Sequence, residues 1–203
     1  MSKKPTVIIV EGMQGVGKGT VTNLLRENIP YSTLMRLSGI ADKSKETGLE
    51  KVFQLRMSEL DFIKANANSE TTFILDRCHL SEKVYCNLGY KEYDFQQQTN
   101  ILNEKLNELT EFFNVYIVVL ALEDNAEEIL KERLKRDKAD FPHSKFNVEN
   151  SLKQQTEYIN EVFKIWQDYS NIKTGIVYNN KEPKEVCEAI MRIVNIWEGK
   201  QWQ

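Results

Sequence analysis

The stretch VIIVEGMQGVGKGT, residues 7–20, joins an apolar run to a cluster of glycines. Residues 7–10 are all β-branched and aliphatic, which is typical of a strand buried on both faces of a parallel sheet. Glycines follow at positions 12, 15, 17 and 19, and Lys18 is the single lysine among them. Residues 20–27 then carry Val21, Leu24 and Leu25 on one side. The stretch therefore predicts a strand, a glycine loop and a helix in succession.

A glycine loop between a strand and a helix is suited to binding phosphate. Glycine lets successive backbone N–H groups turn inward around an anion, and the N-terminus of the following helix adds partial positive charge. Lys18 can reach the outer phosphates of a nucleotide as a point charge. A plain strand-to-helix turn would account for the glycines but not for the lysine. The residues expected to contact the phosphates are Gly12, Gly15, Val16, Gly17, Lys18, Gly19 and Thr20.

The rest of the chain alternates strands with helices. Apolar runs predict further strands at residues 32–37, 71–76, 115–123 and 175–178. Helical spacing predicts helices at residues 49–65, 95–113, 126–138, 148–169 and 183–197. This order implies a single α/β domain over residues 1–203, with a central five-stranded parallel sheet flanked by helices. In the helix at 148–169 we expect Leu152, Ile159, Val162, Phe163 and Trp166 to face inward.

The position of the binding site follows from this sheet. Ligands of open parallel sheets bind beyond the carboxyl ends of the strands. At that edge the sequence places the glycine loop, then Arg36 after the second strand, and Asp76 with Arg77 at the end of the third. We expect these groups to lie close together.

Composition limits the partners. The net charge of −3 gives no electrostatic basis for binding a nucleic-acid polymer or an anionic membrane. Three cysteines without a CxxC pair indicate reduced thiols, so we expect a cytoplasmic protein. The start MSKKPTVIIVEG does not have the pattern of a signal peptide, and no apolar run has transmembrane length.

Two motifs resemble those of nucleoside monophosphate kinases. The run GKGT, in which Gly19 separates Lys18 from Thr20, resembles the loop of adenylate kinases. EGMQGVGKGT resembles the thymidylate kinase pattern EG-x-D-G-x-G-K-T-T. DRCHLSEKVY, residues 76–85, resembles the thymidylate kinase signature D-R-Y-x-x-S-x-x-A-Y, with Cys78 and Val84 as the departures. A salt-bridged strand end followed by a helix is the alternative interpretation of the second motif. The resemblance implies a three-layer P-loop kinase fold.

The thymidylate kinase resemblance also implies roles for residues of the second motif. Arg77 would bind the phosphate of the acceptor, and Ser81 matches the serine of the signature. Asp76 would organise Mg²⁺ through water or orient the reacting groups, and Thr20 is the nearby hydroxyl for the metal. Tyr85 would pack against the sugar and disfavour a 2′-hydroxyl, which selects deoxyribose.

Further substrate-binding positions match the same family less closely. Arg36 in LMRLSG, residues 34–39, matches the arginine of T-R-E-P-G-G. Arg56 lies where the family has a base-contacting arginine, and a solvated helix residue is the alternative. Phe53 is one residue from the position of the base-stacking aromatic, and a core residue is its alternative. Gln14 replaces the aspartate that contacts the sugar 3′-hydroxyl, and this leaves the identity of the base open.

A basic segment follows the strand at 115–123. Thymidylate kinases have a mobile lid with arginines at this point, and here the lid would span approximately residues 131–147. Because Val16 stands where some members have an arginine in the loop, the resemblance implies that the lid supplies it. Arg133 and Arg136 are the expected catalytic arginines, alongside Lys18, Asp76 and Arg77. A solvated helix of alternating charge is the alternative.

These observations predict ATP-dependent phosphorylation, with Mg²⁺, of a deoxynucleoside monophosphate, foremost dTMP. The anionic oxygen of a monophosphate needs positioning and positive charge, whereas a nucleoside 5′-hydroxyl benefits from a carboxylate base. The residues after the second strand offer Arg36 and no acid. A deoxynucleoside kinase, a kinase of another small molecule and a P-loop regulatory module remain alternatives. A homodimer is expected from the resemblance alone.

Overall fold

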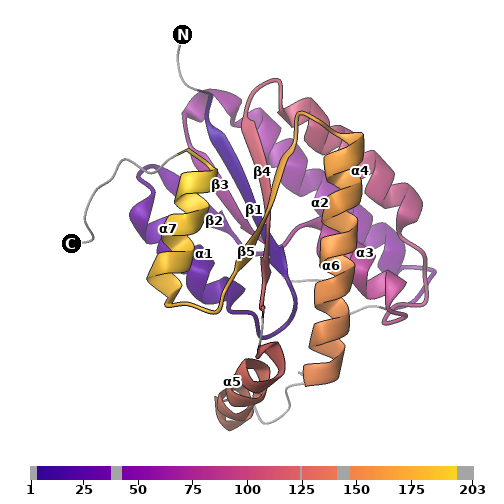
Figure 1. Cartoon of the computed structure of the whole chain (residues 1–203). Helices are drawn as coiled ribbons and strands as arrows, with labels where there is room; N and C mark the ends of the chain where they lie inside the picture. The colour runs from indigo at the N-terminus through magenta and orange to yellow at the C-terminus, as the bar shows by residue number, and fades with distance from the viewer. Residues whose placement is uncertain (1–3, 38–42, 124, 141–146, 196–203) are drawn as a thin grey trace.

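The computed structural model describes residues 4–37, 43–123, 125–140 and 147–195, without the side chains of 134 and 137–140. It confirms the predicted α/β architecture, with a five-stranded sheet in the order β2-β3-β1-β4-β5 (Figure 1). All neighbouring strands pair in parallel. The strands are β1 (Thr6–Gly12), β2 (Ser32–Met35), β3 (Thr72–Asp76), β4 (Asn114–Ala121) and β5 (Lys173–Tyr178).

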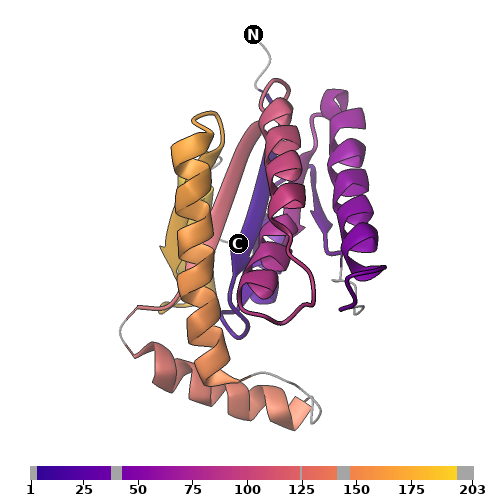
Figure 2. The same cartoon turned by 90° about the vertical axis from the view of Figure 1, so that its right-hand side faces the viewer.

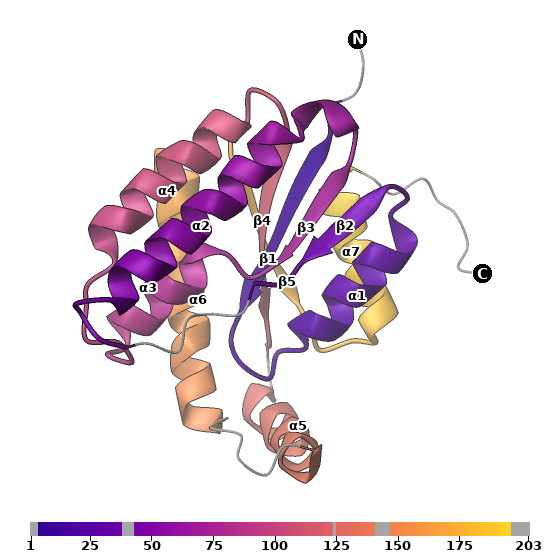
Figure 3. The same ribbon diagram turned by 180° about the vertical axis from the view of Figure 1, so that it is seen from behind.

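Helices cover both faces of the sheet and form the outer two layers. They are α1 (Lys18–Asn28), α2 (Gly48–Ala65), α3 (His79–Asn87), α4 (Gln96–Leu109), α5 (Ala126–Asp140), α6 (Val148–Asp168) and α7 (Pro183–Ile193), with a short 3₁₀ turn at Ala67–Ser69. Helices α1 and α7 cover one face, and α2, α3, α4 and α6 cover the other (Figures 1 and 3). Helix α5 lies beyond the carboxyl ends of the strands (Figures 1 and 2).

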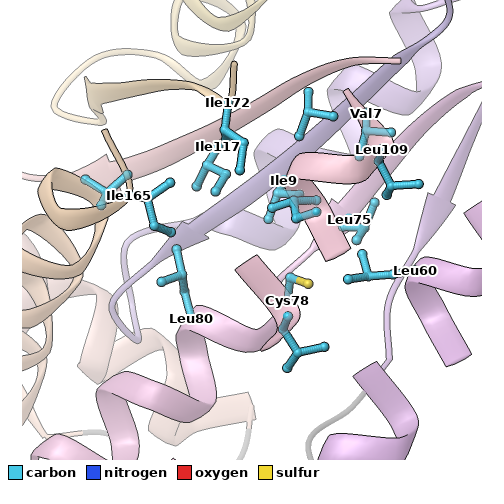
Figure 4. Packing of buried hydrophobic residues seen from close by; sticks show 14 of the residues in the cluster. Val7, Ile9, Leu60, Leu75, Cys78, Leu80, Leu109, Ile117, Ile165 and Ile172 are labelled. Atoms are coloured by element: carbon cyan, nitrogen blue, oxygen red, sulfur yellow. The ribbon is translucent and has the colours of Figure 1, made fainter. Parts of the chain in front are cut away.

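Strand β1 separates two hydrophobic cores, as its continuous apolar run predicts. Val7 and Ile9 pack toward α2, α4 and α6, while Ile8 and Val10 pack toward α1 and α7. Figure 4 shows the first of these cores around Ile9. Fully burying an aliphatic side chain contributes about 1.5–3 kcal/mol. This double burial holds the glycine loop at a fixed place on the sheet edge.

Helix α6 differs from its prediction in which face is buried. Phe163 and Trp166, expected to face inward, are 51% and 60% exposed. The expectation was wrong because part of the buried face of α6 is polar. That face consists of Ser151, Gln154, Tyr158, Glu161, Val162 and Ile165. Two of its polar members meet the candidate site, because Gln154 accepts from Gln14 N and Tyr158 accepts from Arg77, so hydrophobicity alone does not mark this face.

Several boundaries also differ: β2 ends at Met35 rather than at residue 37, and β5 begins at Lys173 rather than at residue 175. Helix α4 ends at Leu109, and residues 110–113 form a turn in which Phe113 N donates to Leu109 O at 2.9 Å. The described part of α7 ends at Ile193, and residues 196–197 of the prediction lie outside the described residues. Among the described residues, no helix combines the length and the apolar character needed to cross a membrane.

Candidate active site

The glycine loop connects β1 to α1, and the predicted Lys18 is the first residue of that helix. Gly17 has φ +92°, and a Cβ there would lie 2.7 Å from the side-chain nitrogen of Asn179, so only glycine fits. Lys18 is buried, and its Nζ donates to the carbonyl oxygens of Gly12 at 2.8 Å and Met13 at 2.7 Å. Burial, followed by the charge of Arg77, holds the pKa of Lys18 well below its usual value. A phosphate at the loop would restore a favourable partner for this ammonium group.

Asp76 lies beside this loop because Val10 of β1 pairs with Asp76 of β3. Its Oδ2 accepts a hydrogen bond from Arg36 Nε at 2.8 Å. In the part of the chain that the structure describes, the hydroxyl next to Asp76 is that of Thr22, at 3.4 Å, whereas Thr20 is exposed. One carboxylate beside a phosphate loop fits a Mg²⁺ ion that is bound chiefly through substrate phosphates and water.

Arg36 points toward the start of α1 and remains accessible. Its Nη2 donates to Thr22 Oγ1 and to Asn23 Oδ1, both at 3.1 Å. Its side chain is 48% exposed. The structure therefore brings Arg36 and Asp76 together, as expected from the sheet topology. Residues 38 and 39 of the LMRLSG segment lie outside the described residues.

Arg77 is held more tightly than Arg36. Its backbone has φ +76°, an uncommon conformation for a residue with a side chain, and its N–H donates to Val10 O at 3.1 Å. Its Nη1 donates to Ser81 Oγ at 2.9 Å and to the Tyr158 hydroxyl at 2.6 Å. The guanidinium carbon lies 6.0 Å from the centroid of the Tyr85 ring. The DRCHLSEKVY segment, residues 76–85, is called the DR motif below. It places Arg77, Ser81 and Tyr85 in one cluster.

Glu11 completes this cluster and was missed in the sequence. It is fully buried at the end of β1, where Oε1 accepts from Cys78 N and Oε2 accepts from Ser81 Oγ, both at 2.7 Å. Burial raises the pKa of Glu11, and the charge of Arg77 opposes this rise. An acid that ends an otherwise apolar strand is the signal that could have identified it. Tyr158 gave no such signal, because it lies on the face of α6 that was not expected to be buried.

Arg56 and Phe53 lie on α2. Arg56 is 3% exposed and donates from Nη1 to Glu59 Oε2 at 2.8 Å, which excludes the solvated alternative. Arg56 Nε and Glu59 Oε1 are buried without a hydrogen-bond partner among the described residues. Phe53 is half-buried and packs against the hydrophobic core, as its alternative predicted.

Cys78 and His79 are buried beside the Arg56–Glu59 pair. Cys78 Sγ lies 3.8 Å from Glu59 Oε2 and 3.4 Å from His79 Nδ1. His79 Nε2 lies 2.7 Å from Asn103 Oδ1. Burial lowers the pKa of His79 to about 4, so the ring is neutral at neutral pH.

Helix α5 brings one of its two predicted arginines to the loop. Arg133 Nη1 donates to Gly15 O at 3.0 Å, and its Nη2 donates to Asn179 O at 3.2 Å. Arg136 is exposed and lines a cavity of about 290 Å³. The cavity is also lined by Ile129, Glu132, Arg133, Asn180 and Lys181. Residues 141–146 of the predicted lid lie outside the described residues.

Gln14 joins the glycine loop to α6. Its backbone N–H donates to the side-chain oxygen of Gln154 at 3.0 Å, and its own side chain is half-buried. Four residues further along the helix, Tyr158 contacts Arg77. The same face of α6 therefore supports both the loop and the DR motif.

Comparisons with known proteins agree with this architecture. No family model matches the chain. A guanylate kinase from Mycoplasma capricolum subsp. capricolum is 25% identical over 222 residues, which cover 97% of this chain and 73% of the relative. The YorR protein of Bacillus subtilis, solved in complex with phosphorylated GDP, aligns with a TM-score of 0.62 at 18% identity, over 94% of this chain and 96% of YorR.

Two further solved structures extend the comparison. A deoxyadenosine kinase from M. mycoides, with dCMP and dCDP bound, aligns with a TM-score of 0.59 at 16% identity, over 94% and 99% of the two chains. A thymidylate kinase from Candida albicans aligns with a TM-score of 0.56 at 18% identity, over 96% and 93%. At these identities the similarity shows the fold, which is that of P-loop nucleotide kinases. Thymidylate kinase is one of several such neighbours.

Proposed function

We propose that the protein transfers the γ-phosphoryl group of ATP to a deoxynucleoside monophosphate, with dTMP as the foremost acceptor. The observation that carries this proposal is the placement of Lys18 and Arg77 beyond the carboxyl ends of the neighbouring strands β1 and β3, where Lys18 begins α1 and Arg77 directly follows β3. Burial lowers the pKa of Lys18, and the nearby charge of Arg77 lowers it further. Two cations at adjacent strand ends are suited to holding two phosphate groups in line for transfer.

On the donor side, the loop amides and Lys18 would bind the β- and γ-phosphates of ATP. Arg133 would add positive charge where the γ-phosphoryl group migrates, because it already contacts the loop at Gly15 O. The cavity beside Arg136 and Asn180 would receive the base of ATP. Mg²⁺, when bound, neutralises charge on the donor phosphates, and Asp76 would hold it through water.

The acceptor is proposed to be a phosphate because the two carboxylates at the ends of β1 and β3, Glu11 and Asp76, are already engaged. Both oxygens of Glu11 already accept hydrogen bonds, and the residue is fully buried. Asp76 Oδ2 already accepts hydrogen bonds from Arg36 Nε at 2.8 Å and from Thr22 Oγ1 at 3.4 Å. A 5′-hydroxyl acceptor would need a carboxylate base to take its proton, whereas a monophosphate would not. Arg36 and Arg77 would bind the acceptor phosphate.

The base of the acceptor is less constrained, and a guanine nucleotide is the second candidate. The thymine proposal relies on the DR motif with Tyr85. Guanine is favoured by the buried Arg56–Glu59 pair, in which Arg56 Nε and Glu59 Oε1 have no hydrogen-bond partner within the described part of the chain. An arginine could donate to the guanine O6, and a carboxylate could accept from its N1–H or N2–H. The guanylate kinase relative and the guanine nucleotide bound to YorR are consistent with this option.

A panel of acceptors tests the proposal. The protein would be incubated with ATP and Mg²⁺ and with dTMP, dGMP, GMP, dCMP, thymidine or deoxyadenosine, while ADP release is followed. We expect dTMP to give the highest kcat/KM and thymidine to give none, and Lys18→Ala controls for contaminating kinases. Turnover of thymidine without dTMP would refute the monophosphate acceptor. Turnover of no nucleotide would favour a non-nucleotide acceptor.

We further propose that the protein acts in the cytoplasm as a homodimer. The reduced cysteines support the compartment: Cys78, Cys86 and Cys187 are all free. The dimer is supported by the thymidylate kinase resemblance. Sedimentation at micromolar concentration would show a mass near twice 23.7 kDa if the dimer forms.

A further inference from the structure

Four side chains from distant parts of the chain converge beneath the proposed acceptor site. Glu11 ends β1, Arg77 follows β3, Ser81 belongs to α3 and Tyr158 belongs to α6. The Ser81 hydroxyl lies 2.7 Å from Glu11 Oε2, 2.8 Å from the Tyr158 hydroxyl and 2.9 Å from Arg77 Nη1. The Tyr158 hydroxyl lies 2.6 Å from the same Nη1. Apart from Arg77, which is half-buried, these residues are buried.

The donors and acceptors of this cluster match in one arrangement when Glu11 is ionised. An ionised carboxylate only accepts, so the single proton of Ser81 points to Glu11. The Tyr158 hydroxyl then donates to Ser81. The two N–H groups of Arg77 Nη1 are left to donate to Ser81 and Tyr158, which both have a lone pair available. Each hydrogen-bonding proton then has a single acceptor, and the hydroxyls of Ser81 and Tyr158 connect the carboxylate of Glu11 to the guanidinium of Arg77.

The cluster engages only one nitrogen of the guanidinium group. No described residue accepts a hydrogen bond from Arg77 Nε or Nη2. These two N–H groups form the side-on fork with which arginine binds two oxygens of a phosphate. In Arg36, by contrast, Nε and Nη2 are already engaged by Asp76, Thr22 and Asn23. Arg77 is therefore anchored on one side and free on the side that matches a phosphate.

We propose that Tyr158 and Glu11 are positioning residues for Arg77: Tyr158 accepts directly from its Nη1, and Glu11 acts on it through Ser81. They fix Nη1 so that the Nε–Nη2 edge is held ready for the phosphate of the acceptor. This inference rests on the proposed function, since it assigns the acceptor phosphate to Arg77. It gives a role to Glu11, the first residue of the EGMQGVGKGT motif, and adds Tyr158, which belongs to neither motif. A freely rotating arginine would lose side-chain entropy on binding, and the anchored one has already lost most of it.

The binding of the acceptor to a Tyr158→Phe variant tests this role. The variant keeps the ring and removes only the hydroxyl, so the fold should persist. We expect the dissociation constant for dTMP, measured by calorimetry, to rise about tenfold, which is typical of losing a hydrogen bond to a charged group. The affinity for ATP should stay within twofold. Tyr169→Phe is the matched control, because Tyr169 lies at the C-terminal end of α6 and its hydroxyl donates at 3.1 Å to Glu104 of α4.

A double-mutant cycle separates positioning from a general structural effect. If Tyr158 acts through Arg77, then adding Tyr158→Phe to Arg77→Ala should not weaken dTMP binding further. Unchanged affinity in Tyr158→Phe, or an equal loss in both backgrounds, would overturn the positioning role. A wild-type protein that does not bind dTMP or any other monophosphate of the panel would overturn it too. If the expected affinities appear without turnover, only the proposed phosphoryl transfer fails.

Discussion

The acceptor side and the lid side of the site hold their arginines in different ways. Arg77 is anchored by two buried hydroxyls that connect to the carboxylate of Glu11. Arg133 comes from the charged helix α5 and is held by two neutral backbone carbonyls, Gly15 O and Asn179 O. Both arginines donate from a charged guanidinium to uncharged oxygens, but only the partners of Arg77 connect onward to a carboxylate. The proposed acceptor cation is therefore tied to a buried side-chain network, whereas the proposed lid cation contacts backbone carbonyls of the loops.

Replacement of Arg133 by alanine should give the largest effect. If it stabilises the migrating phosphoryl group, kcat should fall by about 10³-fold, since an arginine in that role contributes at least this much. The KM for the acceptor should change little. Steady-state kinetics of Arg136→Ala provides the comparison, because Arg136 is exposed beside the cavity and its loss should act mainly on the KM for ATP. Equal losses of kcat in both variants would contradict this assignment.

Replacement of Arg77 by alanine should act on the other side of the reaction. The kcat/KM for dTMP should fall by about 10²–10³-fold, as for the loss of one charge-stabilising donor. Basal ATP hydrolysis in the absence of dTMP should stay within a fewfold of the wild type. Arg77→Lys should not recover activity, because an ammonium group cannot form the two-pronged contact. A parallel loss of ATP hydrolysis would show that Arg77 does not discriminate between donor and acceptor.

Acid should lower the stability of the folded protein through His79. Its pKa is lowered to about 4 in the folded protein, from 6.5, because the ring is buried. Between these values the unfolded chain binds a proton that the folded chain does not, so stability falls as pH falls from 6.5 to 4. This pKa difference corresponds to a loss of about 3 kcal/mol in the free energy of unfolding by the time the pH has fallen to 4. Urea unfolding at several pH values should show a shallower pH dependence for His79→Gln than for the wild type, and parallel curves would contradict the assignment.

The smallest effect is expected on the exposed side of α6. Phe163→Ser removes a ring that is 51% exposed and touches Trp166 edge-on at 6.5 Å between centroids. The free energy of unfolding should change by less than about 0.5–1 kcal/mol. Tyr158→Ala, on the buried side of the same helix, should lower it by about 3–5 kcal/mol. Thermal or urea unfolding of both variants checks the corrected orientation of α6.

The sequence predicted site residues best where they lie within one contiguous segment. The strand, glycine loop and helix are contiguous, so spacing alone placed Lys18, and the DR motif placed Arg77 and Ser81 together. Tyr158 lies 81 residues from Arg77, and only the packing of α6 joins them. Charge alternation could not separate Arg133 from Arg136, because that choice depends on how α5 sits against the loop. The hydroxyl beside Asp76 is that of Thr22 and not the expected Thr20. The rotation of α1 against β3 decides which of these two hydroxyls faces the carboxylate, and the sequence does not show it.

The central claim is that the site recognises the phosphate of the acceptor through Arg77. It is tested most directly by comparing the binding of dTMP and thymidine, which differ only in that phosphate, to the wild type and to Arg77→Ala. We predict that the wild type binds dTMP at least about tenfold more tightly than thymidine, and that Arg77→Ala removes most of this difference. Thymidine binding as tightly as dTMP to the wild type, or a preference for dTMP that survives in Arg77→Ala, would contradict the account.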